Sequence, residues 1–299
     1  MSFKDKVVIV TGSSSGIGAA TAKLFAKEGA KVTLVGRRVE KLKQVERECE
    51  ILSGIKPLTI VADISKDEEA RNIVNKTVDH FKQIDVLVNN AGIVTAKSIL
   101  DTDYVTEFDR IMATNLRAQV VFTNAALPHL LKTKGNIVYV SSVAGTLPMA
   151  MSSNYAASKA GLDHFSRSIA AEVASKGIRV NIVSPGPVKT EINRDSEFSD
   201  EQMEAMAKYF PLGFISKSEE VGELILYIAS DKARSITGST FVLDVGVSLT
   251  GLNSIGDALT QLTCGPQHMP EPARNMYHGK SLDRESFGPR KGTPMFGFE

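Results

Sequence analysis

Short runs of β-branched and aliphatic residues alternate along the chain with longer amphipathic stretches. Each run is almost continuously hydrophobic, which is typical of strands that are buried on both faces of a parallel sheet. The pattern therefore predicts seven strands. They span residues 7–10, 32–35, 58–61, 86–88, 137–140, 179–183 and 240–243.

The stretches between these runs have the length and the periodicity of helices. In the first of them Ile17, Leu24 and Phe25 share one face, and Gly29 follows the expected end. The predicted helices span residues 17–28, 39–52, 66–81, 105–131, 154–176 and 219–230. Strands and helices that alternate in this way predict an α/β fold: a Rossmann-like, doubly wound parallel sheet with helices on both faces. In such folds ligands bind at the carboxyl ends of the strands.

The chain has 299 residues, of which 42% are hydrophobic, and this suits one large core. We expect a single dinucleotide-binding catalytic domain over residues 1–249. The remaining segment, 250–299, holds five of the eleven prolines and seven glycines. It is interpreted as an irregular extension, mobile or wrapped on a partner subunit.

Charge and cysteine content narrow the possible partners. The formal net charge of +1 gives no reason to expect nucleic acid. No apolar run reaches 18 residues, and the first strand begins at Val7 without a preceding secretory signal, so we expect neither membrane nor export. Two distant cysteines, Cys49 and Cys264, indicate free thiols in a reducing, cytoplasmic compartment. No residues have metal-ligand spacing, so we expect no metal.

A glycine-rich segment follows the first strand and opens the first helix. Gly12 permits a tight turn, Gly16 lets backbone approach a pyrophosphate, and Gly18 lets the helix pack closely on the sheet. The helix N-terminus adds free N–H groups and partial positive charge, so the segment predicts a dinucleotide site. Its expected contacts are Thr11, Gly12, Ser14, Ser15, Gly16, Ile17 and Gly18.

The end of the second strand bears on which dinucleotide binds. An NAD site usually has an acid here, whereas this chain has Arg37 and Arg38 and no acid before Glu40. Arginine binds a 2′-phosphate with its planar fork. We therefore expect NADP(H), with NAD(H) as the alternative if both arginines are merely solvated.

Asp63 and Ile64 follow the third strand, where they are expected to bind the adenine amino group and to flank its ring. The competing interpretation is that Asp63 caps the next helix, although Ser65 is an equally good cap.

Tyr155 and Lys159 stand four residues apart, on one face of a predicted helix. A free phenol has a pKa near 10. An ammonium about 4 Å away favours the phenolate by roughly 4 kcal/mol at an effective dielectric near 20, so the pair is expected to lower the phenol pKa toward working pH. This is the range that a general acid needs when a carbonyl oxygen accepts hydride. Chance pairing at the surface is the alternative.

These motifs together resemble the classical short-chain dehydrogenase/reductase family. The resemblance covers residues 4–249 and adds Asn89 to Gly92, Asn115, Ser142 and Pro185-Gly186 to the segments above. It implies that Tyr155 is the catalytic acid and base, that Lys159 lowers its pKa and binds the nicotinamide ribose, and that Ser142 polarises the carbonyl.

Further roles follow from the same resemblance. It implies that the main chain of Asn115 anchors a water in a proton relay, the alternative being a buried polar residue without a catalytic role. It implies that Asn89 braces the sheet. The remaining cofactor contacts that it implies are Asn90, Ala91, Gly92, Pro185, Gly186, Val188 and Thr190. A helix cap is the alternative for Thr190.

The substrate is less well defined. Methionine and aromatic residues between Glu191 and Phe214 suit an apolar lid over the site, or equally a helix face packed on the main body. Val94, Met149 and Met151 add apolar surface near the expected cleft.

The resemblance implies a homotetramer or homodimer that is formed through segments 115–131 and 154–174. The chain departs from the family's Asp-Gly-Gly ending with Asp244-Val245-Gly246, and its tail exceeds the usual family length.

The sequence thus predicts an oxidoreductase that moves hydride between NADP(H) and an apolar carbonyl or secondary alcohol. The alternatives are an NAD-dependent alcohol or hydroxysteroid dehydrogenase, and a non-catalytic nucleotide-sensing scaffold.

Overall fold

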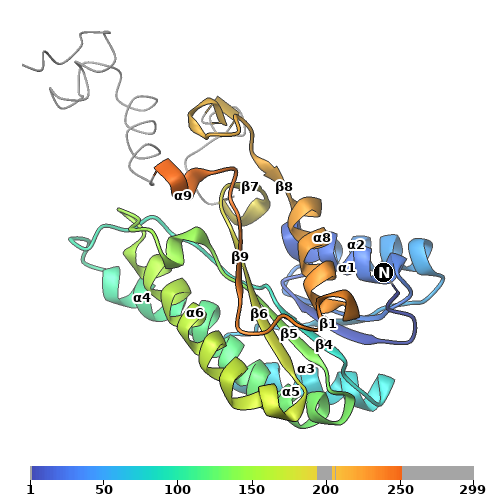
Figure 1. Cartoon of the computed structure of the whole chain (residues 1–299). Coiled ribbons are helices and arrows are strands. Elements are labelled where there is room, and N and C mark those ends of the chain that lie inside the picture. The colour runs from blue at the N-terminus through green and yellow to red at the C-terminus, as the bar shows by residue number, and fades with distance from the viewer. Residues whose placement is uncertain (1, 194–203, 206, 251–299) are drawn as a thin grey trace, which may run out of the picture. The chain divides into compact units, whose positions relative to one another are not determined.

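The computed structural model describes residues 2–193, 204–205 and 207–250. Within these residues one sheet holds seven strands, all parallel, in the order β3-β2-β1-β4-β5-β6-β9 (Figure 1). The strands are β1 (Val7–Thr11), β2 (Lys31–Gly36), β3 (Leu58–Val61), β4 (Val86–Asn89), β5 (Asn136–Val140), β6 (Arg179–Pro185) and β9 (Thr240–Leu243). The predicted Rossmann-like α/β class is confirmed, and each predicted strand is found within two residues of its expected ends.

The strand order reverses direction between β1 and β4. From β1 the chain moves outward to β2 and β3, and it then returns to the other side of β1 to build β4, β5, β6 and β9. Val8 accordingly lies between Val32 of β2 and Val86 of β4. A crevice above such a switch point is where doubly wound sheets bind their ligands.

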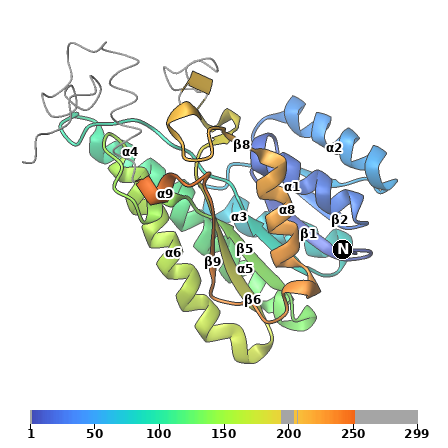
Figure 2. The same ribbon diagram turned by 45° about the horizontal axis from the view of Figure 1, so that its top comes forward.

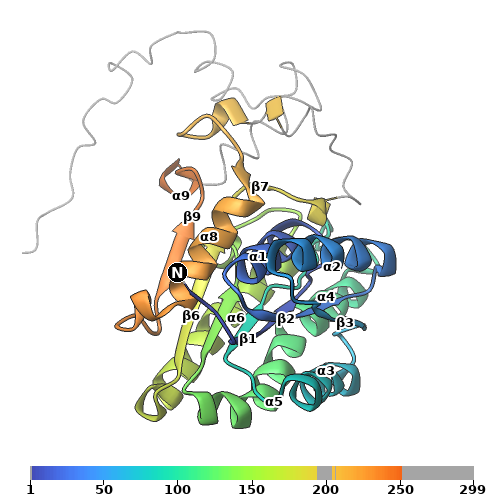
Figure 3. The same ribbon diagram turned by 90° about the vertical axis from the view of Figure 1, so that its right-hand side faces the viewer.

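Two helical layers cover the sheet, one on each face (Figure 3). Helices α1 (Gly16–Lys27), α2 (Val39–Ser53) and α8 (Ser218–Ala229) pack on one face. Helices α3 (Asp67–Phe81), α5 (Ala118–Thr133) and α6 (Ser153–Val173) pack on the other. Because both faces are covered, all five residues of β1 and all five of β5 are buried, which explains their unbroken hydrophobicity.

The predicted helix over residues 105–131 is divided in the structure. It consists of α4 (Tyr104–Met112), a π-helical turn, Ala113–Arg117, and α5. A π turn inserts one extra residue into the helix, and such turns are frequent at functional sites. Here the turn contains Asn115, whose side chain is fully buried.

Three short elements were not predicted. Strands β7 (Val188–Lys189) and β8 (Ser216–Lys217) form a separate two-stranded parallel sheet, and α9 (Val247–Thr250) follows β9. They lie beyond the carboxyl ends of the main strands (Figure 1). The expected irregular extension from residue 250 falls, except for Thr250, outside the described residues.

No helix among the described residues is both long and apolar enough to cross a membrane. Cys49 is a free, buried thiol in α2, and burial raises its pKa to about 12.

Candidate functional site

Every residue singled out in the sequence as a cofactor or catalytic contact lies at or beyond the carboxyl end of a strand, or on the helix that follows. Because the strands are parallel, these ends share one edge of the sheet (Figure 2). The glycine-rich segment follows β1, the two arginines follow β2, Ser142 follows β5 and Gly186 follows β6. The site is therefore assembled from segments that are far apart in sequence.

The Thr11 hydroxyl ties the glycine-rich segment to the end of β4. It accepts the backbone N–H groups of Asn90 and Ala91, each at 3.0 Å, and donates to the Val88 carbonyl at 3.3 Å. The Asn90 amide donates in return to the Thr11 carbonyl at 2.8 Å. The resemblance implied a cofactor contact for Asn90. In the structure the Asn90 side chain braces the loop, whereas Asn89, which was expected to brace the sheet, is fully buried and donates to the Thr123 hydroxyl at 3.4 Å.

Two of the glycines are required by close contacts. Gly12 has a φ of +69°, and a Cβ there would lie 2.8 Å from the Ala91 Cα. A Cβ on Gly18 would lie 2.4 Å from the Gly12 carbonyl oxygen and 2.5 Å from Asn90 Nδ2. Any side chain at either position would push β4 away from the loop.

The start of α1 suits a pyrophosphate. Ser15, at the N-cap, makes no side-chain cap hydrogen bond, and no acid stands in the first turn. The first N–H groups and the positive end of the helix dipole thus keep their capacity for an anion. These residues fit the dinucleotide that the sequence predicts, with Ser14, Gly16 and Ile17 at the same turn.

Arg38, and not Arg37, lies against the glycine-rich segment. Its guanidinium donates to the Ser14 hydroxyl at 3.1 Å and also to the Ser15 hydroxyl. Arg37 is exposed, and its charge helps to lower the pKa of Asp63. The two arginines therefore differ in position, because consecutive residues leaving a strand point in opposite directions.

Asp63 does not cap the next helix, the alternative to adenine binding, because the N-cap of α3 is Lys66; it makes a turn contact with Ser65 instead. Its Oδ1 accepts the Ser65 N–H at 3.1 Å and the Ser65 hydroxyl at 2.9 Å. Burial raises the pKa of Asp63, but the Ser65 hydrogen bonds and the charge of Arg37 together lower it by more, so the net shift is downward. Ile64 is 7% exposed and packs in the core under α3.

Tyr155, Lys159 and Ser142 come together where β5 meets α6. The Ser142 hydroxyl lies close enough to the Tyr155 phenol to lower its pKa. The Lys159 ammonium lies 5.7 Å from the centre of the Tyr155 ring and donates to the Val140 carbonyl at 2.9 Å. Both α6 side chains are buried, at 9% and 3% exposure.

Burial changes the expected electrostatics of this pair. The sequence predicted that Lys159 would lower the pKa of Tyr155. In the structure the pKa of Tyr155 is raised, because burial disfavours the phenolate, although the Ser142 hydrogen bond works in the opposite direction. Burial also lowers the pKa of Lys159 to about 8. The predicted lowering of the Tyr155 pKa is therefore wrong, and the phenol holds its proton at neutral pH.

Asn115 connects the π turn to the candidate catalytic group, which consists of Ser142, Tyr155 and Lys159. Its amide pairs with the backbone of Ile93, with two hydrogen bonds of 2.8 Å, and it donates to the Ser158 hydroxyl at 3.2 Å. A Cβ on Gly92 would lie 3.4 Å from Asn115 Oδ1 and 3.5 Å from Lys159 Nζ. An added Cβ would thus be in ordinary van der Waals contact with both groups.

The segment after β6 is held by β9. Gly186 donates to the Leu243 carbonyl at 2.9 Å, and a Cβ on it would lie 2.7 Å from that of Asp244. Pro185 ends β6 and Val188 begins β7. The Thr190 hydroxyl accepts the Ile192 N–H at 3.3 Å, which is the capping contact weighed against a cofactor role.

Apolar side chains are exposed in the loops that border this edge. Leu100, Met151 and Leu249 are 88%, 56% and 85% exposed, and Leu212 and Phe214 are also exposed. Phe210 is instead buried at 4% and packs on the body. Phe198, Met203 and Met206, from the predicted lid, lie outside the described residues.

One residue at the site was not recognised in the sequence. Asp163 lies one turn after Lys159 on α6, is 2% exposed, and has no well-aligned hydrogen bond to either carboxylate oxygen, although the Ser141 hydroxyl is close. Its spacing from Tyr155 and Lys159, four residues and then four more, was the available signal. Burial raises the pKa of Asp163, and its charge raises those of Lys159 and Tyr155.

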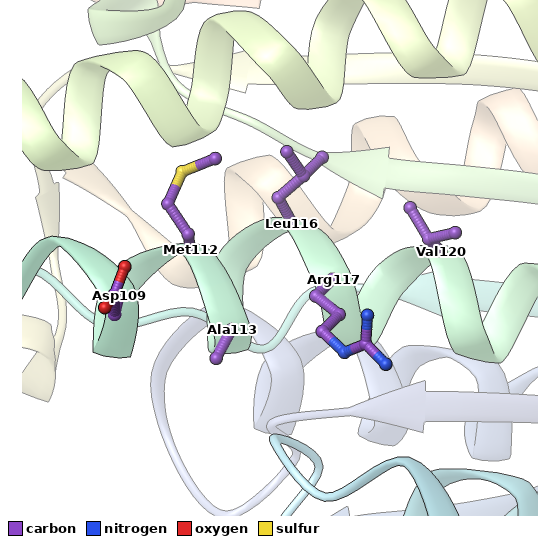
Figure 4. A pocket seen from close by; sticks show the side chains of 6 residues that line it. All are labelled: Asp109, Met112, Ala113, Leu116, Arg117 and Val120. Atoms are coloured by element: carbon purple, nitrogen blue, oxygen red, sulfur yellow. The ribbon is translucent and has the colours of Figure 1, made fainter.

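A cavity of about 420 Å³ lies on the outer surface of α4, the π turn and α5 (Figure 4). Met112, Leu116 and Val120, four residues apart, form its apolar side. Asn115 belongs to the same turn but points inward, so this cavity is distinct from the catalytic group.

Known proteins are similar to this one over most of the chain. A family model described as enoyl-(acyl carrier protein) reductase matches residues 12–248. The 3-oxoacyl-(acyl-carrier-protein) reductase FabG of Thermotoga maritima is 37% identical over 248 residues, which cover 83% of this chain and 99% of that protein. The 3beta-hydroxysteroid dehydrogenase 1 of Eggerthella lenta is 35% identical over 250 residues, covering 83% and 95%.

A solved structure agrees with these relatives. A short-chain dehydrogenase/reductase of unknown function from Caenorhabditis elegans, crystallised with cofactor, has a TM-score of 0.75 and 38% identity, and the match covers 83% of this chain and 96% of that one. The chain belongs to the classical short-chain dehydrogenase/reductase family, as its sequence indicated. It is an oxidoreductase of alcohol and carbonyl groups that works with a nicotinamide cofactor.

The position of Asp163 leads to a prediction about pH. Replacing Asp163 with Asn removes the charge that raises the pKa values of Lys159 and Tyr155, so both are expected to fall. The loss of reductase activity at high pH, where the proton donor ionises, should then begin at a lower pH than in the wild type. A pH profile of kcat measures this. Glu172→Gln, an exposed change on the same helix, should leave the profile unmoved. An unchanged profile for Asp163→Asn would mean that this carboxyl is uncharged at working pH.

Proposed function

We propose that the protein is an NADP(H)-dependent reductase that converts an apolar ketone or aldehyde to its alcohol. The observation that carries this proposal is the burial of the Tyr155 phenol beside Ser142, which raises the pKa of the phenol. An alkoxide that forms from a carbonyl is a stronger base than a phenolate. A phenol that keeps its proton at neutral pH is therefore the form that reduction requires.

Each side chain of the catalytic group has a distinct task in this proposal. Ser142 donates a hydrogen bond to the carbonyl oxygen and holds it beside the phenol. Tyr155 gives its proton to that oxygen as negative charge develops on it. Lys159 stabilises the resulting phenolate, and the Asn115 region returns a proton toward Lys159. Reduced nicotinamide, when bound, supplies the hydride.

The choice of NADP(H) rests on the end of β2. Arg38 brings a guanidinium to the Ser14 and Ser15 hydroxyls, next to the start of α1. The segment that follows β2 has no acid before Glu40, so it lacks the carboxylate that usually holds the ribose of NAD and would repel a 2′-phosphate. Thr11, Gly92, Gly186, Val188 and Thr190 border the rest of the expected cofactor path, with Asp63 and Ile64 at its adenine end.

An apolar substrate is supported by the exposed side chains at this edge. Leu100, Met151 and Leu249 are exposed on the segments that follow β4, β5 and β9, and exposed apolar surface of this kind often marks a binding site. The second candidate is an NAD-dependent alcohol or hydroxysteroid dehydrogenase, and the name of the Eggerthella lenta relative supports a hydroxysteroid substrate. A non-catalytic scaffold is the least supported hypothesis, since binding a nucleotide without catalysis does not require Ser142 beside Tyr155.

The first test is a panel of apolar ketones, aldehydes and secondary alcohols, followed through nicotinamide absorbance with NADPH and NADH. With the best substrate, Tyr155→Phe should lower kcat by about 10²- to 10⁴-fold, because the proton donor is lost. The Kd for NADPH should stay within about twofold of the wild type, since the ring remains. A variant that keeps more than a tenth of wild-type turnover would rule out Tyr155 as the donor.

The two arginines allow a matched test of the cofactor. Arg38→Ala should raise the KM for NADPH by at least about tenfold, because a fork to the phosphate is lost, and should change that for NADH much less. Arg37→Ala removes the same charge from an exposed site and should have a smaller effect on both. Equal effects of Arg38→Ala on NADPH and NADH would contradict a 2′-phosphate site.

We further propose a homodimer or homotetramer joined through α4, α5 and α6. The half-buried stripe of Met112, Leu116 and Val120 gives a second copy an apolar surface to cover (Figure 4). A cytoplasmic location is part of the same proposal, on the argument from the two cysteines.

Leu116→Arg tests the assembly. A charge in the middle of the apolar stripe should disfavour the buried contact and shift the protein toward the monomer. Light scattering after size-exclusion chromatography measures the mass in solution. Ile51→Arg, on exposed α2, is the control and should keep the wild-type mass. An unchanged oligomer in Leu116→Arg would place the interface elsewhere.

A further inference from the structure

Glu191 binds the same arginine that the proposed function assigns to the cofactor. Its carboxylate accepts a hydrogen bond from the Arg38 guanidinium through Oε2 and from the Lys41 ammonium at 3.0 Å through Oε1. Arg38 also donates to Ser14 of the glycine-rich segment, and Lys41 lies in the first turn of α2, three residues after Arg38. These two contacts lower the pKa of Glu191, so the carboxylate is ionised at neutral pH.

The neighbouring residue lies across the same path. A Cβ on Gly16 would lie 3.1 Å from both the Cβ and the Cγ2 of Thr190. Gly16 is the position at which backbone is expected to approach the pyrophosphate. Thr190 thus lies over the glycine-rich segment, and Glu191 lies on Arg38. Each of these two contacts joins residues that are more than 150 positions apart in the sequence.

A carboxylate and a phosphate compete for a guanidinium in the same way. Both present two oxygens to the planar fork, and one fork satisfies one such partner at a time. The contacts of Glu191 with Arg38 and Lys41 are therefore the contacts that a 2′-phosphate at this position would need.

We propose that Glu191 is a specificity-determining residue, an internal anion that occupies Arg38 and Lys41 until the 2′-phosphate of the cofactor displaces it. The inference rests on the proposed NADP(H) site. NADP(H) must break the two Glu191 contacts in order to bind. NAD(H), which lacks the 2′-phosphate, leaves them in place. Glu191 thereby narrows the preference for NADP(H) over NAD(H) that Arg38 creates.

The size of the effect follows from the exposure of the partners. The side chains of Arg38 and Glu191 are 31% and 41% exposed, and ion pairs so close to solvent are weak. Removing the competing carboxylate should therefore tighten NADP⁺ binding by only about twofold to fivefold. The gain should shrink at high salt, because the Arg38–Glu191 attraction that is removed is itself screened.

The experiment compares the wild type, Glu191→Gln and Glu40→Gln by titration calorimetry. Glu40 is a matched control: it carries the same charge at the start of α2, is 81% exposed and pairs with Lys43 instead of Arg38. The titrants are NADP⁺, NAD⁺, and the fragments adenosine 2′,5′-bisphosphate and AMP, which lack the nicotinamide end and so do not depend on Thr190.

Glu191→Gln should lower the Kd of NADP⁺ and of adenosine 2′,5′-bisphosphate by about twofold to fivefold, and should leave NAD⁺ and AMP within experimental error. Glu40→Gln should change none of the four. Weaker binding of NADP⁺ to Glu191→Gln would overturn the proposal, because Glu191 would then orient Arg38 for the phosphate. An unchanged Kd for NADP⁺ and adenosine 2′,5′-bisphosphate, the two titrants that carry a 2′-phosphate, would overturn it as well, and so would equal tightening of NAD⁺.

The same titrations keep this inference separate from the proposed function. If the wild type binds NAD⁺ at least as tightly as NADP⁺, the proposed cofactor is wrong, whatever Glu191 does. If the wild type prefers NADP⁺ and Glu191→Gln does not differ from it, the cofactor stands and the competition does not exist.

Discussion

The close approach of the β1–α1 turn to the end of β4 is the constraint on which the site depends. The Thr11 hydroxyl holds two backbone N–H groups of the β4 end, and glycines at positions 12 and 18 leave no room for a side chain between the two segments. This contact sets the position of the glycine-rich loop. It also sets that of Gly92, which lies beside Lys159 and Asn115. The expected cofactor path and the catalytic group are thus fixed by one backbone contact at the switch point of the sheet.

Burial then decides the chemistry of the catalytic group. The sequence suggested a phenol made acidic by a neighbouring ammonium, whereas the structure withdraws both groups from water and disfavours the charged form of each. Asp163, buried behind Lys159, adds a negative charge that keeps protons on both. The pKa values of Tyr155 and Lys159 therefore depend on their burial and on the charge of Asp163, and not on the Tyr155–Lys159 pair alone.

Most of the fold was predictable because its signals are local and repeated. Continuous hydrophobic runs gave the seven strands, and helical periodicity gave the helices between them. The π turn at Asn115 has no such signal, since one extra residue hardly disturbs a hydrophobic pattern, and two-residue strands such as β7 are too short for any. At the site, Tyr155 and Lys159 followed from their spacing, and Ser142 followed from the family resemblance. Which of Arg37 and Arg38 faces the loop did not, because it depends on side-chain direction, and the role of Glu191 depends on a contact across about 150 residues.

The π turn joins two surfaces that would otherwise be independent. Asn115 points inward to Ile93 and Ser158, while its neighbour Leu116 contributes to the apolar outer face and comes within reach of Gly161 on α6. A subunit pressed against that outer face would bear on the backbone that carries Asn115. The proposed subunit contact and the proposed proton relay would then be linked through the five residues of the π turn, Ala113–Arg117. A change in quaternary structure would change the turnover rate.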